Sequence, residues 1–222
     1  MDSAPIFISL RTAAAAILVT FFIGLLAAAL VARIRRRLWK MILDGILTLP
    51  LVLPPTVAGF FLLYIFGVRG PVGKFFLDFF GLRIAFSWSA TVLASTAISF
   101  PLMYRSARGA LEQVDPSLVY AARTLGMPEW AIFCKVSLPT AMPGIVSGTI
   151  LAFARGLGEF GATAMIAGNI AGKTRTLPLA IYSAVAAGDM DQAYDYVLVI
   201  LLISFIVVAL MNYVTTLEKS SR

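Results

Sequence analysis

The sequence contains no histidine and only one cysteine, Cys134. Histidine is the commonest metal ligand and the usual general base near neutral pH, so its absence counts against metal sites and hydrolytic catalysis. A lone cysteine cannot form an intramolecular disulfide. We therefore expect a protein that is not an enzyme and that carries no metal and no cofactor of its own.

Charged residues are scarce as well. Asp, Glu, Lys and Arg together make up 13% of the 222 residues, and apolar residues make up 60%. Soluble globular domains carry roughly 25% charged residues. The apolar residues also form runs of about 20, the length that a helix needs to cross the hydrocarbon core. This composition predicts an all-α integral membrane protein.

Five apolar stretches divide the chain, and a long polar interruption at residues 112–139 separates the third from the fourth. We predict a single transmembrane domain over residues 1–222, with membrane spans at about residues 12–32, 42–67, 86–103, 142–166 and 196–214. The sequence therefore predicts a five-helix membrane core with one large polar loop.

The distribution of basic residues predicts the orientation of the chain. Five Lys and Arg residues follow the first span within residues 33–40, whereas Arg11 is the only basic residue before it. Cytoplasmic segments are enriched in Lys and Arg, so we expect the N-terminus outside and the C-terminal tail, with Lys219 and Arg222, in the cytoplasm. This bias and attraction to anionic lipid explain the formal charge of +7 without a nucleic-acid partner.

Prolines interrupt the second predicted span at Pro50, Pro54 and Pro55. Proline breaks the helical hydrogen-bond ladder, and lipid cannot satisfy the carbonyl groups that are freed. The break is therefore expected at the bundle interior. There it either borders a transport pathway or gate, with Pro54, Pro55 and Thr56 as candidate residues, or serves helix packing alone.

Hydroxyl side chains form a stripe on the third predicted span, where Thr91, Ser95 and Ser99 recur every four residues. Such stripes usually hydrogen-bond neighbouring helices together, and some of them line a passage. Ser99 is a candidate pathway residue on the second interpretation.

Two opposite charges, Arg155 and Glu159, fall within the fourth predicted span. They are one helical turn apart, so their side chains can pair on one face. Charges within a span are costly and usually functional. The pair is expected either to line the pathway or gate, or to fix the helix against a neighbour, and the sequence does not choose between these roles.

Turn and cap residues predict folded structure within the loop at residues 112–139. Asp115 can cap a helix that has Pro116 at its first position, and Gly126 can end that helix in the left-handed conformation. Pro128 is placed to begin a second helix. The loop is therefore expected to present a compact helix on the cytoplasmic side.

An apolar stripe runs along this predicted helix, because Leu118, Ala121, Ala122 and Leu125 recur at helical spacing. A compact apolar helix on a membrane loop favours docking of a partner protein. The alternative is a folded loop that packs only on its own protein.

The loop resembles the EAA loop of ABC importer permeases, which reads Glu-Ala-Ala, three residues, Gly, nine residues, Ile-x-Leu-Pro. Tyr120 stands in place of the family's glutamate, and Val136 stands in place of the isoleucine. The resemblance implies a coupling helix that seats in a cleft of an ATP-hydrolysing subunit. It assigns the contact with that ATPase to Tyr120, Ala121, Ala122, Arg123, Gly126, Leu138 and Pro139.

Two further stretches resemble the permease subunit of molybdate ABC transporters, LPLVLPPTVAG at residues 49–59 and LGEFGAT at residues 157–163. This resemblance implies alternating access driven by ATP, with ATP and Mg held on the partner ATPase and no cofactor on this chain. It also implies the partners, which are a second copy of the chain, two ATPase subunits and an extracytoplasmic molybdate-binding protein. The expected location is the plasma membrane, in bacteria the inner membrane.

Two alternatives stay open. The transported ion could be sulfate, thiosulfate or tungstate, because tetrahedral oxyanions can share a pathway while the delivery protein selects among them. The chain could also be an ATP-independent carrier or channel. Secondary carriers often show internal inverted repeats, and the sequence has no convincing one, which favours the ATP-driven interpretation.

Overall fold

The computed structural model describes residues 2–34 and 36–220, and the side chains of these residues apart from residue 212 and residues 214–220. The side chains of Lys219 and Arg222 in the predicted tail, and Arg35 in the basic cluster, lie outside the described residues. Every regular element in the described part is helical. The elements are α1 (Ala4–Ala32), α2 (Arg37–Val52), α3 (Pro55–Phe66), α4 (Pro71–Phe80), α5 (Trp88–Glu112), α6 (Pro116–Thr124), α7 (Glu129–Ile132), the π-helix η1 (Phe133–Ser137), α8 (Leu138–Leu157), α9 (Gly161–Ile166), α10 (Leu177–Ala187) and α11 (Met190–Ser220).

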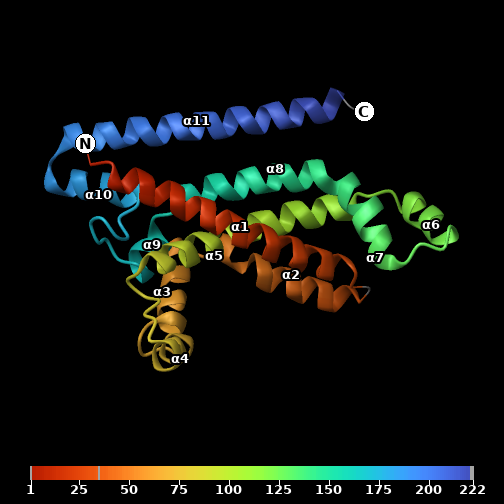
Figure 1. Cartoon of the computed structure of the whole chain (residues 1–222), viewed down its shortest axis with the longest axis horizontal. Helices are drawn as coiled ribbons and strands as arrows, with labels where there is room; N and C mark the ends of the chain where they lie inside the picture. Colours follow the sequence, from red (N-terminus) through yellow and green to blue (C-terminus); the bar gives the residue numbers. More distant parts are fainter. Residues whose placement is uncertain (1, 35, 221–222) are drawn as a thin grey trace.

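Three long helices form the centre of the bundle. α5 packs against both α1 and α8, and their shared core includes Ala28, Met103, Tyr104 and Ile145. Figure 1 shows α1, α5 and α8 running along one another. α6 and α7 lie at one end of the bundle, and α9 and α10 lie at the other. The loop predicted at residues 112–139 therefore sits at one pole of the molecule.

In the part of the chain that the structure describes, three helical stretches are long and apolar enough to cross a membrane, and they overlap the first, fourth and fifth predicted spans. They are Ala4–Ala32, Glu129–Leu157 and Met190–Met211. The bent pair α2 and α3 is a fourth candidate. The third predicted span lies within α5, which continues to Glu112. The start of α1 and the end of α11 lie at opposite ends of the bundle (Figure 1), as an odd number of crossings requires; the count of five spans stays a prediction.

The second predicted span consists of two helices with a bend of 110° between them. Leu53 has an extended backbone (φ −68°, ψ 140°), the conformation favoured before a proline, and Pro54 has no N–H to continue the helix. The predicted break is confirmed, but the bend is too large for a kink within one continuous helix over residues 42–67.

The short helix α3 packs on α9, which is distant in the sequence. A Cβ atom on Gly59 would lie 2.7 Å from the Cα atom of Ala162, so only glycine allows this approach of the two backbones. In Figure 1, α3 and α4 project from the side of the bundle next to α9. The sharp bend after α2 therefore serves to dock α3 on α9.

The fourth predicted span is also interrupted. We expected one helix over residues 142–166, and this was wrong, because α8 ends at Leu157 and α9 begins at Gly161. Phe160, between them, has non-helical backbone angles (φ −121°, ψ −58°). The break falls in GLGEFG, where three glycines lower the helix propensity.

The helix before this break begins earlier than expected. α7, η1 and α8 follow one another without interruption from Glu129. Leu138 and Pro139 therefore lie inside a long helical stretch, which starts after Pro128, where a second helix was predicted to begin. The proline is tolerated because the π-helix η1 directly before α8 replaces the regular α-helical hydrogen-bond ladder at the point where the proline lacks an N–H group.

An additional helix, α10, occupies the stretch between the fourth and fifth predicted spans and was not predicted. Leu177, Leu179 and Ala180 are buried, and the backbone amide of Leu177 donates a hydrogen bond to Ser9 Oγ at 2.7 Å. α10 packs on α11 and α1. It closes the end of the bundle opposite to α6.

Candidate functional site

The helix predicted within the polar loop is α6, and its ends form as expected. Asp115 Oδ1 accepts a hydrogen bond from the backbone amide of Ser117 at 2.8 Å, and this bond lowers the pKa of Asp115. Gly126 has a left-handed backbone (φ +75°), and its amide donates to the Arg123 carbonyl at 2.9 Å. A residue with a Cβ would be strained at that φ. The cap and the glycine turn are confirmed.

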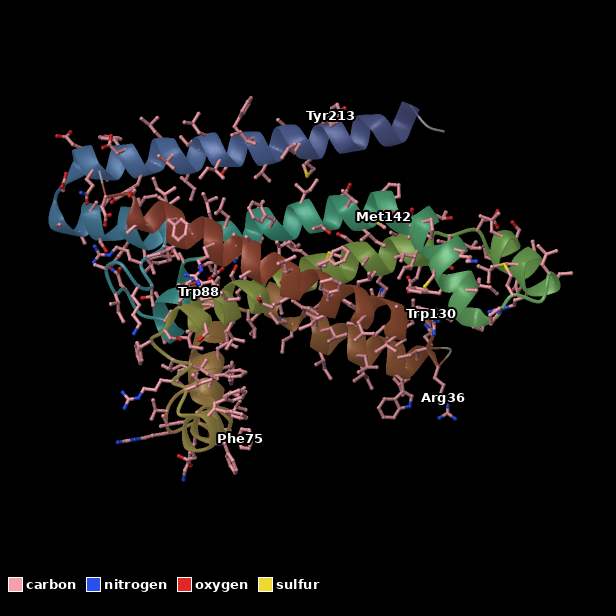
Figure 2. The ribbon with its side chains drawn as sticks, viewed as in Figure 1. Arg36, Phe75, Trp88, Trp130, Met142 and Tyr213 are labelled. Atoms are coloured by element: carbon pink, nitrogen blue, oxygen red, sulfur yellow. The ribbon has the colours of Figure 1, made fainter. Side chains whose placement is uncertain are left out.

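Apolar side chains of α6 face outward at the end of the bundle. Tyr120 is 63% exposed and Leu125 is 81% exposed, whereas Ala122 is only 5% exposed. Leu118 is also exposed, and Trp130 lies on α7 at the same end (Figure 2). The predicted apolar stripe is therefore divided, because Ala122 packs on its own protein while Leu118 and Leu125 are free to contact a partner.

An ion pair joins α6 to α7 across the Gly126 turn. Arg123 Nε donates to Glu129 Oε1 at 2.6 Å, and Arg123 Nη2 donates to Glu129 Oε2 at 3.1 Å. These two hydrogen bonds lower the pKa of Glu129 and raise the pKa of Arg123. The two-pronged geometry fixes the relative orientation of α6 and α7. Arg123 thus holds the segment together from within.

The other predicted contact residues lie in two places. Ala121 is exposed on α6, beside Tyr120. Leu138 packs against the core of α1, α5 and α8, and Pro139 is exposed at the first turn of α8. The assignment of these residues to contact with an ATPase stays a prediction. The α6–η1 segment (residues 116–137) carries most of the accessible positions.

Arg155 and Glu159 form the predicted ion pair, although α8 ends between them. Arg155 Nη1 lies 2.7 Å from Glu159 Oε2. The side chain of Glu159 is 1% exposed, and that of Arg155 is 33% exposed. Glu159 Oε2 is buried and has no hydrogen bond of suitable direction, so the contact is an ion pair by distance. The carboxylate is thus deep in the protein, with its partner at the surface.

Glu159 has a second role that was not predicted. Its Oε1 atom accepts a hydrogen bond from the backbone amide of Ala162 at 2.9 Å. A carboxylate at a helix N-terminus satisfies a free N–H group and interacts favourably with the helix dipole. The cap depends on the break after Leu157, and the glycines around Glu159 were the sequence signal for it.

The two helix breaks meet in space. A Cβ atom on Gly161 would lie 3.0 Å from Pro55 Cβ and 3.2 Å from the Thr56 amide nitrogen. Pro54 and Thr56 are exposed, and Pro55 is half-buried. The structure therefore brings the proline motif of the second predicted span next to the Glu159 region of the fourth. Whether these residues line a pathway stays a prediction.

Ser99 lies in the bundle core, in contacts between helices. Its Oγ atom donates to the Ser95 carbonyl at 2.7 Å and lies 3.2 Å from Thr20 Oγ1 on α1. On the same face of α5, Thr91 Oγ1 lies 2.9 Å from Thr12 Oγ1. Thr91 and Ser99 join α5 to α1, and Ser95 Oγ joins α5 to α8 by donating to the Gly156 carbonyl at 3.0 Å, which is the packing role weighed from the sequence.

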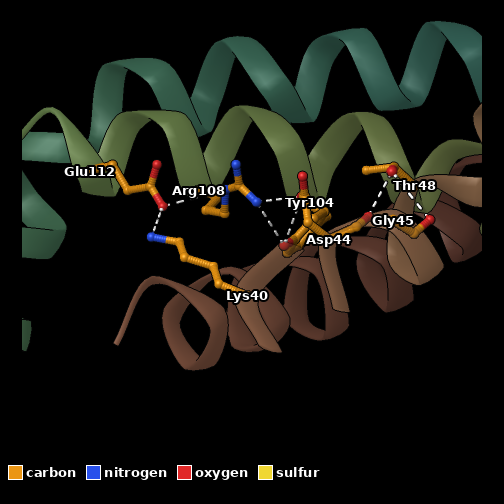
Figure 3. A network of polar contacts seen from close by, with 7 residues as sticks. All are labelled: Lys40, Asp44, Gly45, Thr48, Tyr104, Arg108 and Glu112. Atoms are coloured by element: carbon orange, nitrogen blue, oxygen red, sulfur yellow. Dashed lines mark hydrogen bonds and ion pairs between the residues drawn. The ribbon is translucent and has the colours of Figure 1, made fainter. Parts of the chain in front are cut away.

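A polar network that was not predicted joins α2 to α5 (Figure 3). Arg108 Nη1 donates to Asp44 Oδ1, and Tyr104 OH donates to the same oxygen at 3.2 Å. Lys40 Nζ lies 2.7 Å from Glu112 Oε1, and Arg108 Nε lies 3.4 Å from it. No residue of α2 is fully buried, so this network is a principal attachment of α2. The available signal was Asp44, a carboxylate inside an apolar predicted span.

The carboxylates of these sites are paired with basic side chains. They are Asp44, Glu112, Glu129 and Glu159. Within residues 2–34 and 36–220, no group of three or more His, Cys, Asp or Glu side chains is placed to hold a metal ion. The arrangement holds helices together and offers an apolar surface on α6.

Comparison with known proteins places the chain among transport proteins. Residues 10–217 match the family described as binding-protein-dependent transport system inner membrane component. The chain is 48% identical to the molybdenum transport system permease protein ModB of Escherichia coli (strain K12) over 80% of this chain and 77% of that protein. It is 43% identical to the putative molybdenum transport system permease protein YvgM of Bacillus subtilis (strain 168) over 91% and 88%. It is 38% identical to the sulfate transport system permease protein CysT of Escherichia coli (strain K12) over 85% and 68%.

Solved structures share the fold. The MetNI methionine ABC transporter in an inward-facing conformation matches with a TM-score of 0.68 at 20% identity, over 95% of this chain and 94% of that chain. A bacterial alginate ABC transporter in complex with a pentasaccharide-bound periplasmic protein matches with a TM-score of 0.72 at 15% identity, over 95% and 76%. The chain therefore belongs to the family of binding-protein-dependent transport system inner membrane components.

Proposed function

We propose that this chain is the transmembrane permease subunit of an ATP-driven importer that moves molybdate across the bacterial inner membrane by alternating access. The observation that carries the proposal is the identity of 48% and 43%, over 80% and 91% of the chain, to two relatives named as molybdenum permeases. The relative named as a sulfate permease is less similar, at 38% identity.

The α6–η1 segment is the contact with a separate ATPase subunit in this proposal. Its exposed side chains, Leu118, Tyr120 and Leu125, supply apolar surface that a partner can bury. The Arg123–Glu129 pair holds α6 and α7 together, so that a movement of the ATPase displaces the segment as one body. The segment joins the end of α5 to the start of α8, so its movement reaches both central helices. ATP and Mg belong to the partner, and this chain performs no hydrolysis.

The working complex contains two copies of this chain, two ATPase subunits and an extracytoplasmic molybdate-binding protein. A single chain offers three candidate spans, or four with the bent pair, and its centre is filled by the core of α1, α5 and α8. A pathway between two copies is therefore the better account. The alginate transporter, solved with its periplasmic protein, supports delivery by a binding protein.

The meeting point of the two helix breaks is the proposed gate region. Short helices such as α3 and α9 can shift against long ones with little loss of buried surface. Arg155, whose side chain is partly exposed, carries a positive charge that suits an anionic substrate. Thr56 and Pro54 are exposed beside the same break.

The second candidate is a permease for sulfate, thiosulfate or tungstate. The 38% identity to a sulfate permease favours it. Molybdate, tungstate and sulfate are tetrahedral dianions, so a pathway that conducts one is chemically suited to the others. The delivery protein then decides which ion is transported.

Uptake of radiolabelled molybdate tests the proposal. Proteoliposomes hold this chain with its co-purifying ATPase and the binding protein, with or without internal ATP. We expect uptake only with internal ATP, competed strongly by tungstate and weakly by sulfate. Strong competition by sulfate would favour the second candidate, and uptake without ATP would favour a carrier or channel.

The proposed ATPase contact has its own test. Leu125→Asp puts a charge on an exposed apolar position. We expect the ATPase to dissociate from this variant, so that it no longer co-purifies with the chain. Leu82→Asp, the same change at an exposed leucine between α4 and α5 and outside the α6–η1 segment, is the matched control and should retain the ATPase. Equal retention by both variants would contradict docking through α6.

A further inference from the structure

A cavity of about 520 Å³ lies between the last turns of α5 and the first turns of α8. Its polar lining residues are Arg105, Ser106, Gln113 and Thr140. α5 and α8 are the helices that the α6–η1 segment connects, and that segment lies at the same end of the bundle (Figure 1). The cavity is therefore distinct from the break region at Pro54 and Glu159.

The cavity offers hydrogen-bond donors that the protein does not use. Among the described residues, Arg105, Ser106 and Gln113 have no side-chain hydrogen bond and no ion pair, and no lining residue carries a carboxylate. Thr140 is different, because its hydroxyl donates to the Val136 carbonyl at 2.7 Å. The unused groups are a guanidinium, a hydroxyl and an amide, and all three can donate to oxygen.

A neighbouring arginine on α5 shows what the cavity lacks. Arg108, three residues after Arg105, is paired with both Asp44 and Glu112. Arg105 is exposed and has no such partner in the described part of the chain. The acids are therefore on the α2 side, and the α8 side carries an uncompensated positive charge. Unpaired arginine beside neutral donors is the arrangement that recognises oxyanions.

Small residues keep the site open. Gly109 and Gly144 line it, and a Cβ atom on Gly144 would lie 2.7 Å from the Ala110 Cβ atom. α5 and α8 are thus in near contact beside the cavity. A displacement of the segment that joins them changes the width of the cavity directly.

We propose that this cavity binds a free tetrahedral oxyanion of the molybdate type on the cytoplasmic side, with Arg105, Ser106 and Gln113 as its donors. The identity of the ion rests on the proposed function. The ion occupies this site after it leaves the transport pathway and before it enters the cytoplasm. The occupancy of the site depends on the position of α6. A lipid phosphate headgroup has the same chemistry of oxygen acceptors and negative charge, so the experiment separates the two sources.

Protection of a cysteine from labelling measures occupancy. Gly109→Cys, at a lining position where a Cβ atom meets no other atom within 4 Å, is placed in a Cys134→Ser background, and the complex with its ATPase is set in nanodiscs of phosphatidylcholine. The readout is the rate of reaction with N-ethylmaleimide without molybdate divided by the rate with it, at constant ionic strength in chloride. We expect molybdate and tungstate to slow labelling several-fold.

Two further variants identify the donor. Arg105→Gln should abolish the protection, whereas Arg37→Gln, the same charge change on α2, should preserve it. Each variant is described by its own ratio of labelling rates without and with molybdate. The ratio is used because removing the nearby guanidinium also changes the intrinsic reactivity of the thiol. Thr140→Cys is a second reporter, at an exposed lining position that is not one of the three donors, and it carries the same measurement if Gly109→Cys does not assemble.

Three outcomes would overturn the proposal. The first is that molybdate gives no protection, and the second is that protection survives Arg105→Gln. The third is that phosphatidylglycerol in the nanodisc slows labelling and molybdate has no added effect. The last outcome would assign the cavity to a lipid headgroup. Uptake is measured separately, so loss of the transport function and loss of the site are distinguishable.

Discussion

Arg155 Nη1 and Glu159 Oε2 lie 2.7 Å apart across the end of α8. The same glutamate accepts the backbone amide of Ala162 through its other oxygen at 2.9 Å. One buried carboxylate therefore holds a partly exposed arginine and begins the next helix. Because α9 carries α3, this pair sets the position of both short helices.

Glu159→Ala is expected to destabilise the purified complex and to abolish uptake at normal membrane levels. The variant leaves Arg155 unpaired and removes the cap of α9. The cost is roughly 2–3 kcal/mol, less than for a fully buried pair because Arg155 is one-third exposed. Glu159→Gln keeps an acceptor for Ala162 and should cost about 1 kcal/mol. Both variants are compared with the wild type by thermal unfolding and by uptake. Wild-type behaviour of Glu159→Ala would show that the pair is needed for neither stability nor transport.

Gly126→Pro should uncouple ATP hydrolysis from transport while leaving membrane insertion intact. The φ of +75° at Gly126 is closed to proline, whose ring fixes φ near −65°, so the turn after α6 must change. ATPase activity and molybdate uptake are measured on the same preparation. Gly81→Pro is the control, because Gly81 also has a positive φ (+64°) but ends α4, far from α6. Normal uptake by Gly126→Pro would contradict a coupling role for the turn.

Asp44 and Arg108 are expected to show a favourable coupling energy in a double-mutant cycle. Asp44→Asn, Arg108→Gln and the double variant are compared by thermal unfolding. Both side chains are partly exposed, so the coupling is about 1 kcal/mol, the upper end for accessible pairs. Each single variant should also loosen α2, which is seen as faster proteolysis within residues 33–40. A coupling energy near zero would mean that α2 is held by apolar contacts instead.

The Arg123–Glu129 pair predicts a pH dependence for the α6–η1 segment. Hydrogen bonds from Arg123 lower the Glu129 pKa below its ordinary 4.5. The pair therefore contributes fully above that pH and is lost as the pH falls through the lower, folded-state pKa. Hydrogen exchange of amides 116–129, corrected for the intrinsic effect of pH, should accelerate as the pH falls through this lowered pKa.

Glu129→Gln is the matched variant for this measurement. It lacks the carboxylate at every pH, so exchange in the segment should already be fast at neutral pH, and the acceleration that remains in acid should be only that caused by protonation of the Asp115 cap. Identical profiles for the wild type and Glu129→Gln would show that the ion pair does not order the segment.

Local rules predicted several parts of the structure correctly. Asp115 caps α6, Gly126 turns left-handed after it, and the Leu53–Pro54 junction breaks the second predicted span. Each depends on a residue and its immediate neighbours, because caps and backbone angles are local properties. The Arg155–Glu159 pair belongs to the same class, since four residues separate its members.

Other features involve residues far apart in the sequence and were missed. The contact of Asp44 with Arg108, and that of Gly59 with Ala162, depend on how helices cross. The helix α10 was missed because its apolar run is too short to span a membrane. The cavity at Arg105 was missed because its lining comes from α5 and α8, which the α6–η1 segment separates in the sequence.

The sequence by itself determined that this is an all-helical membrane protein of the permease type, with a capped helix between its third and fourth apolar stretches. Composition, caps and proline positions suffice for the helical membrane fold and the capped helix, because each acts within a few residues, whereas the permease type followed from the resemblance of sequence motifs to a known family. Only the tertiary structure decided that the two helix breaks meet, that Glu159 serves two partners, and that Arg105 is unpaired while Arg108 is not. Those outcomes depend on which sides of the helices contact each other, and these contacts are set by the packing of the whole bundle.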